Sequence, residues 1–177
     1  MNIDTVIWLL PAVFMVHDFE EIIFMKAWLN RNASRLRTRF PRIASRIIPH
    51  LESLSTEAFA LCVAEEFILL CLAVLLMAEN GWYSAFAGLV LAYGAHLIVH
   101  LVQALAFRSY IPAVLMSLLT APYCFWALFS CRHLIVWTEA IGWAGIFLTI
   151  IVPNLLLMHL LAGKFDAKIR KKTDPSD

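Results

Sequence analysis

Five long apolar stretches take up most of this chain, and they constrain its fold more than any other feature. They cover approximately residues 3–25, 57–78, 82–107, 111–130 and 134–163. A helix needs about 20 apolar residues to cross the hydrocarbon core of a bilayer. We therefore predict an all-α polytopic membrane protein, a bundle of five transmembrane helices. We expect the whole chain to form a single integral membrane domain.

The composition excludes two broad classes of protein. Of the 177 residues, 62% are hydrophobic and 15% are charged, whereas soluble domains are about half apolar and about a quarter charged. A chain of this length cannot hide that excess in one core, so a water-soluble globule is excluded. The net charge of +1 leaves no basic surplus to neutralise phosphates, so we expect no nucleic-acid partner. The oligomeric state is left open.

The basic residues predict how the bundle is oriented. Seven lysines and arginines lie between Lys26 and Arg46, Arg108 follows the third span, and a basic tail runs from Lys164 through Lys168, Arg170, Lys171 and Lys172. With five spans, all of these lie on one side of the membrane and only Arg132 lies on the other. The positive-inside rule then places the amino terminus outside and the carboxyl terminus in the cytoplasm.

The connection over residues 27–56 has a pattern of its own. It intersperses Leu36, Phe40, Ile43 and Ile47 with arginines at helical spacing. We expect it to lie along the inner interface as a basic amphipathic helix against anionic lipid. A solvated loop that only sets the topology is the alternative.

Polar groups within the spans predict the functional site. Ionisable side chains in hydrocarbon are costly and mark functional sites by default. At about 1.5 Å of rise per residue, they lie about 7 to 18 Å from the cytoplasmic ends of their spans, and the outer half of every span is almost purely apolar. The set is His17, Asp18, Glu20, Glu21, Glu65, Glu66, His96, His100, Gln103, Asn154 and His159.

The spacing of these residues indicates a shared cluster. His17, Glu20 and Glu21 follow i, i+3 and i+4, so they share one helix face. His96, His100 and Gln103 form a second stripe at i, i+4 and i+7. Several carboxylates in a low dielectric must be protonated or be held by a cation.

We therefore predict a centre of one or two transition-metal ions, iron or zinc with manganese also admissible. Its predicted ligands are His17, Glu20, Glu21, Glu65, His96, His100 and His159. We assign catalytic acid–base roles to Glu65 and Glu66. Supporting hydrogen bonds to the ligands are expected from Asp18, Gln103 and Asn154. Structural alternatives are a buried ion pair for His17, a protonated pair for Glu65 and Glu66, and interhelical hydrogen bonds for Asn154 and Gln103.

Such a centre predicts a di-metal enzyme that acts on a lipid-like substrate in the cytoplasmic half of the bilayer. Iron would support an oxidase or hydroxylase, and zinc would support a hydrolase. We expect Arg108 and Tyr110 to bind the polar end of the substrate. Its chain is expected to lie among Phe86, Leu89, Phe125 and Phe129.

Two other classes of function stay open. One is a proton- or ion-coupled transporter in which the carboxyl and imidazole groups form a relay. Confinement of the polar groups to one half of the membrane argues against a continuous path. The other is a metal-free isomerase that uses glutamate and histidine as acid and base on a lipophilic substrate.

One segment resembles a known family signature. The pentapeptide His17-Asp18-Phe19-Glu20-Glu21 is similar to the motif of the HXXEE family of small bacterial membrane proteins. Downstream, Arg108-Ser109-Tyr110-Ile111-Pro112 is similar to an Arg-x-Tyr-x-Pro-Gly pattern of that family, with Ala113 where glycine is expected. The resemblance implies that His17, Glu20 and Glu21 act as a group and that the protein lies in a bacterial inner membrane. It implies no particular reaction.

Overall fold

The fold, a computed structural model, is described over residues 3–173, with side chains left aside at 165 and 167–173. Every element in this range is a helix, which confirms the all-α prediction. In chain order they are α1 (Ile3–Arg39), α2 (Pro41–Ser53), α3 (Thr56–Asn80), α4 (Tyr83–Phe107), α5 (Val114–Cys131) and α6 (Trp137–Thr173). The side chains of the predicted basic tail at Lys168, Arg170, Lys171 and Lys172 lie outside the described residues.

Four of the described helices are long and apolar enough to cross a membrane, which indicates an integral membrane protein. They are α3, α4, α5 and the part of α6 from Trp137 to Lys164. The first predicted span, in α1, is not among them. Three carboxyl groups, those of Asp18, Glu20 and Glu21, interrupt its apolar stretch within four positions.

The basic connection forms a helical hairpin in place of one amphipathic helix. α1 continues to Arg39 because no proline or glycine occurs between Met25 and Phe40. The break comes at Phe40, which takes φ −131° and ψ 59°, since a residue before proline is disfavoured in the helical region. The second part of α1 then packs on α2 through Leu29, Ala33, Ala44 and Ile48.

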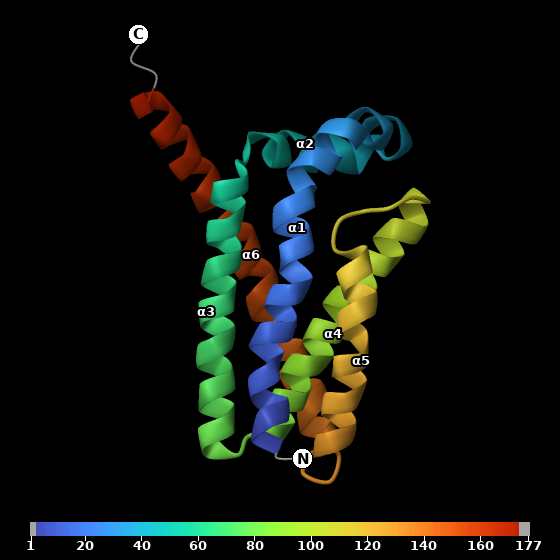
Figure 1. Cartoon of the computed structure of the whole chain (residues 1–177), viewed down its shortest axis with the longest axis vertical. Coiled ribbons are helices and arrows are strands. Elements are labelled where there is room, and N and C mark those ends of the chain that lie inside the picture. The colour runs from blue at the N-terminus through green and yellow to red at the C-terminus, as the bar shows by residue number, and fades with distance from the viewer. Residues whose placement is uncertain (1–2, 174–177) are drawn as a thin grey trace.

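All of the described helices except α2 form a closed ring. α1 packs between α3 and α5, α4 packs between α5 and α6, and α6 closes the ring against α3. These five helices run along the long axis of the molecule, and α2 lies across one end (Figure 1). The loop between α4 and α5 and the carboxyl end of α6 lie at the α2 end, whereas the beginning of α1 lies at the opposite end (Figure 1). In this ring α1 and α4 face each other across the centre.

An apolar core fills the half of the bundle away from α2. It includes Leu10 of α1, Val74 of α3, Phe86 of α4 and Ala127 of α5. α4 and α6 approach most closely at Gly88, where an added Cβ would lie 2.5 Å from the Cβ of Trp143 and 2.8 Å from the carbonyl oxygen of Ala140. The core therefore fixes the helices at one end, and the buried histidines come next along α1 and α4.

Candidate metal centre

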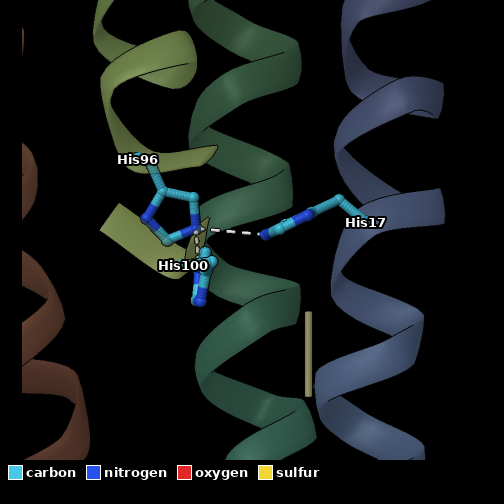
Figure 2. Close-up of side chains that lie close together, drawn as sticks. All are labelled: His17, His96 and His100. Carbon is cyan, nitrogen blue, oxygen red and sulfur yellow. Dashed lines mark hydrogen bonds between the residues drawn. The ribbon is translucent and has the colours of Figure 1, made fainter. Parts of the chain in front are cut away.

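Three histidines from α1 and α4 converge on one point in the middle of the ring. The Nε2 atom of His96 lies 3.2 Å from Nε2 of His17 and 3.0 Å from Nε2 of His100. Each ring offers one ligand nitrogen, and the three nitrogens lie within 4.8 Å of one another. Figure 2 shows the rings of α4 directed toward the ring of α1. We call these three residues the histidine trio.

Hydrogen bonding alone does not satisfy the histidine trio. A neutral imidazole nitrogen either donates one hydrogen or accepts through one lone pair. Nε2 of His96 therefore cannot form two full hydrogen bonds, although two nitrogens lie within bonding distance of it. A cation at the centre would accept a lone pair from all three rings at once.

The spacing of the nitrogens fits a transition metal. Two nitrogens at about 2.0–2.1 Å from one tetrahedral zinc ion lie about 3.3–3.4 Å apart. The two observed separations, 3.0 and 3.2 Å, are within a few tenths of an ångström of that value. For these two pairs, only small shifts would be needed to place an ion between the rings, and the third separation stays within 4.8 Å.

The three rings differ in how far they are enclosed. His17 has no exposed surface and His100 is 7% exposed, whereas His96 is exposed. Tyr93 packs its ring edgewise on His17, with centroids 6.0 Å apart. The outer nitrogens, Nδ1 of His17 and of His100, are buried without a hydrogen-bond partner within the described residues. The two buried rings are therefore held in place by packing, since their Nδ1 atoms form no hydrogen bond within the described residues.

Carboxyl groups adjoin the histidine trio. Oε1 of Glu21 lies 3.3 Å from Nε2 of His100, a separation that suits two ligands of one ion. Oδ1 of Asp18 lies 3.9 Å from Nε2 of His17. Asp18 therefore adjoins a predicted ligand imidazole, but at a distance too long for the supporting hydrogen bond. The structure thus groups His17, Asp18, Glu21, His96 and His100.

Glu20 is directed elsewhere, although the sequence places it on the same face. Its Oε1 accepts a hydrogen bond of 2.6 Å from the hydroxyl of Tyr110, and its Oε2 accepts one of 2.8 Å from the backbone N–H of Met116. Met116 is in the first turn of α5, where free N–H groups attract a carboxylate. Glu20 therefore joins α1 to the start of α5, a role that we did not predict.

The two adjacent glutamates of α3 also separate. Oε2 of Glu65 accepts a hydrogen bond of 3.0 Å from Nδ2 of Asn154 on α6. Asn154 thus makes the interhelical hydrogen bond that we considered as its alternative, and Glu65 is the acceptor. Glu66 interacts electrostatically with Asp18 and Glu21. Of the two, Glu66 is therefore the one that adjoins the carboxyl groups of α1.

His159 lies in a separate group near α2. Its ring centroid is 5.7 Å from those of His50 and Phe59. Its Nε2 is buried with no hydrogen-bond partner in the described part of the chain. The structure does not bring His159 into the histidine trio. Gln103, predicted to assist the ligands, is exposed.

The residues predicted to bind substrate do not form one pocket. Arg108 and Tyr110 are exposed in the loop between α4 and α5, but the Tyr110 hydroxyl is bound to Glu20. Burial and that bond raise the pKa of the Tyr110 hydroxyl. Phe86 and Leu89 are buried in the apolar core, whereas Phe125 and Phe129 are exposed. The structure does not bring these four residues together, because Phe86 and Leu89 face the interior of the bundle and Phe125 and Phe129 face outward.

Comparison with known proteins identifies a family. The family model described as "Protein of unknown function with HXXEE motif" matches residues 8–127. This range contains α1 from Trp8 onward and most of α5, so it covers every member of the histidine trio. No curated protein and no solved structure matches the chain. The chain belongs to the HXXEE family.

Proposed function

We propose that this HXXEE-family chain is a membrane metalloenzyme that acts on a lipid-like substrate. The single observation that carries the proposal is the convergence of three imidazole nitrogens within 4.8 Å. His17, His96 and His100 would bind the ion, with Glu21 as a fourth ligand. Iron, zinc and manganese all suit this mixture of nitrogen and oxygen donors.

The exposure of His96 supports a lipid-like substrate. His17 and His100 are buried, but His96 is exposed in the middle of an apolar helix. A substrate dissolved in the bilayer could reach the ion at that ring without crossing the bundle. The ion would supply Lewis-acid or redox chemistry, and the apolar neighbours would exclude water.

The position of α1 in the ring of helices supports the five-span topology of the proposal. α1 packs between α3 and α5 and begins at the end opposite to α2 (Figure 1). Its carboxyls face the interior of the bundle or the start of α5, where a bilayer would not contact them. With α1 as the fifth span and α2 in the cytoplasm, the centre lies in the inner leaflet. We place it in a bacterial inner membrane.

Metal analysis tests the proposal. Protein purified in detergent without chelator is expected to hold at least one transition-metal ion per chain, measured by mass spectrometry of the metal. His17→Ala and His96→Ala should lose it. His133→Ala is the matched control, because His133 is exposed in the connection between α5 and α6.

Two results would contradict the proposal. A wild-type protein that stays metal-free after reconstitution with iron, zinc and manganese would favour the proton relay or the metal-free isomerase. A structure in lipid in which His96 is sealed from the bilayer would exclude the lipid-like substrate, even with the metal present.

A further inference from the structure

Three carboxyl groups on the neighbouring helices α1 and α3 lack a basic partner among the described residues, and two of them adjoin the histidine trio. They belong to Asp18 and Glu21 of α1 and Glu66 of α3, and each interacts electrostatically with the other two. Within the described residues, none forms an ion pair with lysine or arginine, and their only nitrogen partners are His17 and His100. One divalent ion supplies two positive charges, which does not balance three carboxylates.

Two oxygen atoms of this group are also unsatisfied. Oδ2 of Asp18 and Oε1 of Glu66 are buried with no hydrogen-bond partner among the described residues. Asp18 is 5% exposed, and its other oxygen faces His17 at 3.9 Å, so this carboxyl is held against the histidine trio. A buried oxygen without a partner is destabilising, unless a cation or a proton completes it.

The two helices that supply these oxygens are direct neighbours. α1 packs along α3, and α3 passes behind the three histidines in the view of Figure 2. Glu65, the neighbour of Glu66 in sequence, is directed to Asn154 of α6. The α1–α3 contact therefore offers oxygen ligands on the side of the histidine trio that α3 covers.

We infer that a second metal ion binds beside the first, held by Asp18 and Glu66, with Glu21 shared between the two ions. This inference rests on the proposed function. The two positions differ in chemistry, because the first is rich in imidazole nitrogen and the second has carboxylate oxygen alone. Carboxylate ligands suit hard ions such as manganese, so Mn²⁺ is the probe that we choose for the second position. Bridged ions in such centres lie about 3.5–4 Å apart.

The experiment counts ions in the full-length protein. Detergent-purified chain is loaded with Mn²⁺, washed, and measured for metal content and by electron paramagnetic resonance. We expect two ions per wild-type chain and an exchange-coupled spectrum. Glu66→Gln and Asp18→Asn should each retain one ion with the spectrum of isolated Mn²⁺. Glu65→Gln is the matched control, one position along the same helix, and should retain two coupled ions.

The outcomes separate the inference from the proposed function. One uncoupled ion in the wild type, lost in His96→Ala, would overturn the second site and leave the proposed function standing. No ion in the wild type would overturn both. Two ions in Glu66→Gln, with one in Glu65→Gln, would overturn the assignment to Glu66. The wild-type spectrum needs no variant, so the test does not depend on the folding of any mutant.

Discussion

Two adjacent glutamates in α1 have different partners, and the difference is decided outside their own helix. Glu21 faces His100, whereas Glu20 bonds Tyr110 and Met116. Helical spacing places both glutamates within one turn of His17. The sequence therefore predicts that the three residues are close together, but not which glutamate faces the histidines and which faces α5. The division depends on where the start of α5 packs, and no local pattern encodes that. The same limit applies to Glu65 and Glu66.

The bond between Glu20 and Tyr110 gives the first prediction. Tyr110→Phe removes a 2.6 Å hydrogen bond and should destabilise the protein by about 1.5–3 kcal/mol, as is usual for a bond to a charged group. Metal content should not change, since Glu20 lies outside the histidine trio. Thermal unfolding in detergent measures the effect. Tyr83→Phe is the control, because its hydroxyl has no hydrogen bond within the described residues.

The difference in stability between the wild type and Tyr110→Phe should depend on pH, because the pKa of Tyr110 is raised. The unfolded chain loses this phenolic proton at about pH 10, and the folded chain keeps it to higher pH. The stability contributed by Tyr110 is therefore complete below about pH 10 and is lost as the pH rises above it. The gap in Tm between wild type and Tyr110→Phe should be constant from pH 7 to 9 and narrow above pH 10. A gap that widens there would contradict the assignment.

Ala113 gives the second prediction. It precedes α5 with φ 79°, in the left-handed region that costs an ordinary residue about 1–2 kcal/mol. Ala113→Gly should therefore stabilise the protein by about 0.5–1 kcal/mol and raise Tm by about 1–4 °C. Ala121→Gly, inside α5, is the control and should lower Tm, because glycine is a poor helix former. Equal losses in both variants would show that the turn is not strained.

The elements themselves were predicted well where an apolar stretch was uninterrupted. α3 and α4 match the expected ranges closely, since nothing but length and hydropathy defines them. α1 and α6 both extend beyond the predicted ends, because the residues there are rich in charge and carry no apolar signal. The break at Phe40 depends on Pro41, a signal that the sequence offered and that the expectation of one interfacial helix overlooked.

The contact between α4 and α6 gives the third prediction. A Cβ at Gly88 would lie 2.5 Å from the side chain of Trp143 and 2.9 Å from the backbone nitrogen of Ala144. Gly88→Ala should separate the two helices and destabilise the protein by about 1–3 kcal/mol. Gly94→Ala is a matched control on the same helix, where a Cβ meets nothing within 4 Å. Gly94→Ala should leave Tm unchanged or raise it, and a loss as large as that of Gly88→Ala would contradict the packing argument.

At the scale of the whole molecule, the sequence predicts the all-α class. It also predicts that an apolar half is separate from the half that holds the polar cluster. The apolar core lies toward the beginning of α1, and the histidine trio lies farther along the same helices, as the depth estimate requires. The ring order of the helices could not be predicted. It decides which polar side chains meet, and it arises from close packing at positions such as Gly88 that hydropathy does not distinguish.

The fourth prediction concerns the orientation of the whole bundle. Ser45 of α2 and His133 of the α5–α6 connection are both exposed and lie at opposite ends. In a background without Cys62, Cys71, Cys124 and Cys131, His133→Cys should react with an impermeant maleimide in intact cells. Ser45→Cys should react only after permeabilisation. Labelling of Ser45→Cys in intact cells would reverse the proposed orientation.

The pairing of α1 with α4 has a consequence for how the chain is made. His17 and His96 are separated by 79 positions, so at about 5–20 residues per second the ribosome needs about 4–16 s to supply the second after the first. Throughout that interval α1 carries three carboxyl groups and lacks both histidines of α4. With α1 as the proposed fifth span, its stable insertion is therefore expected to wait until α4 has been made.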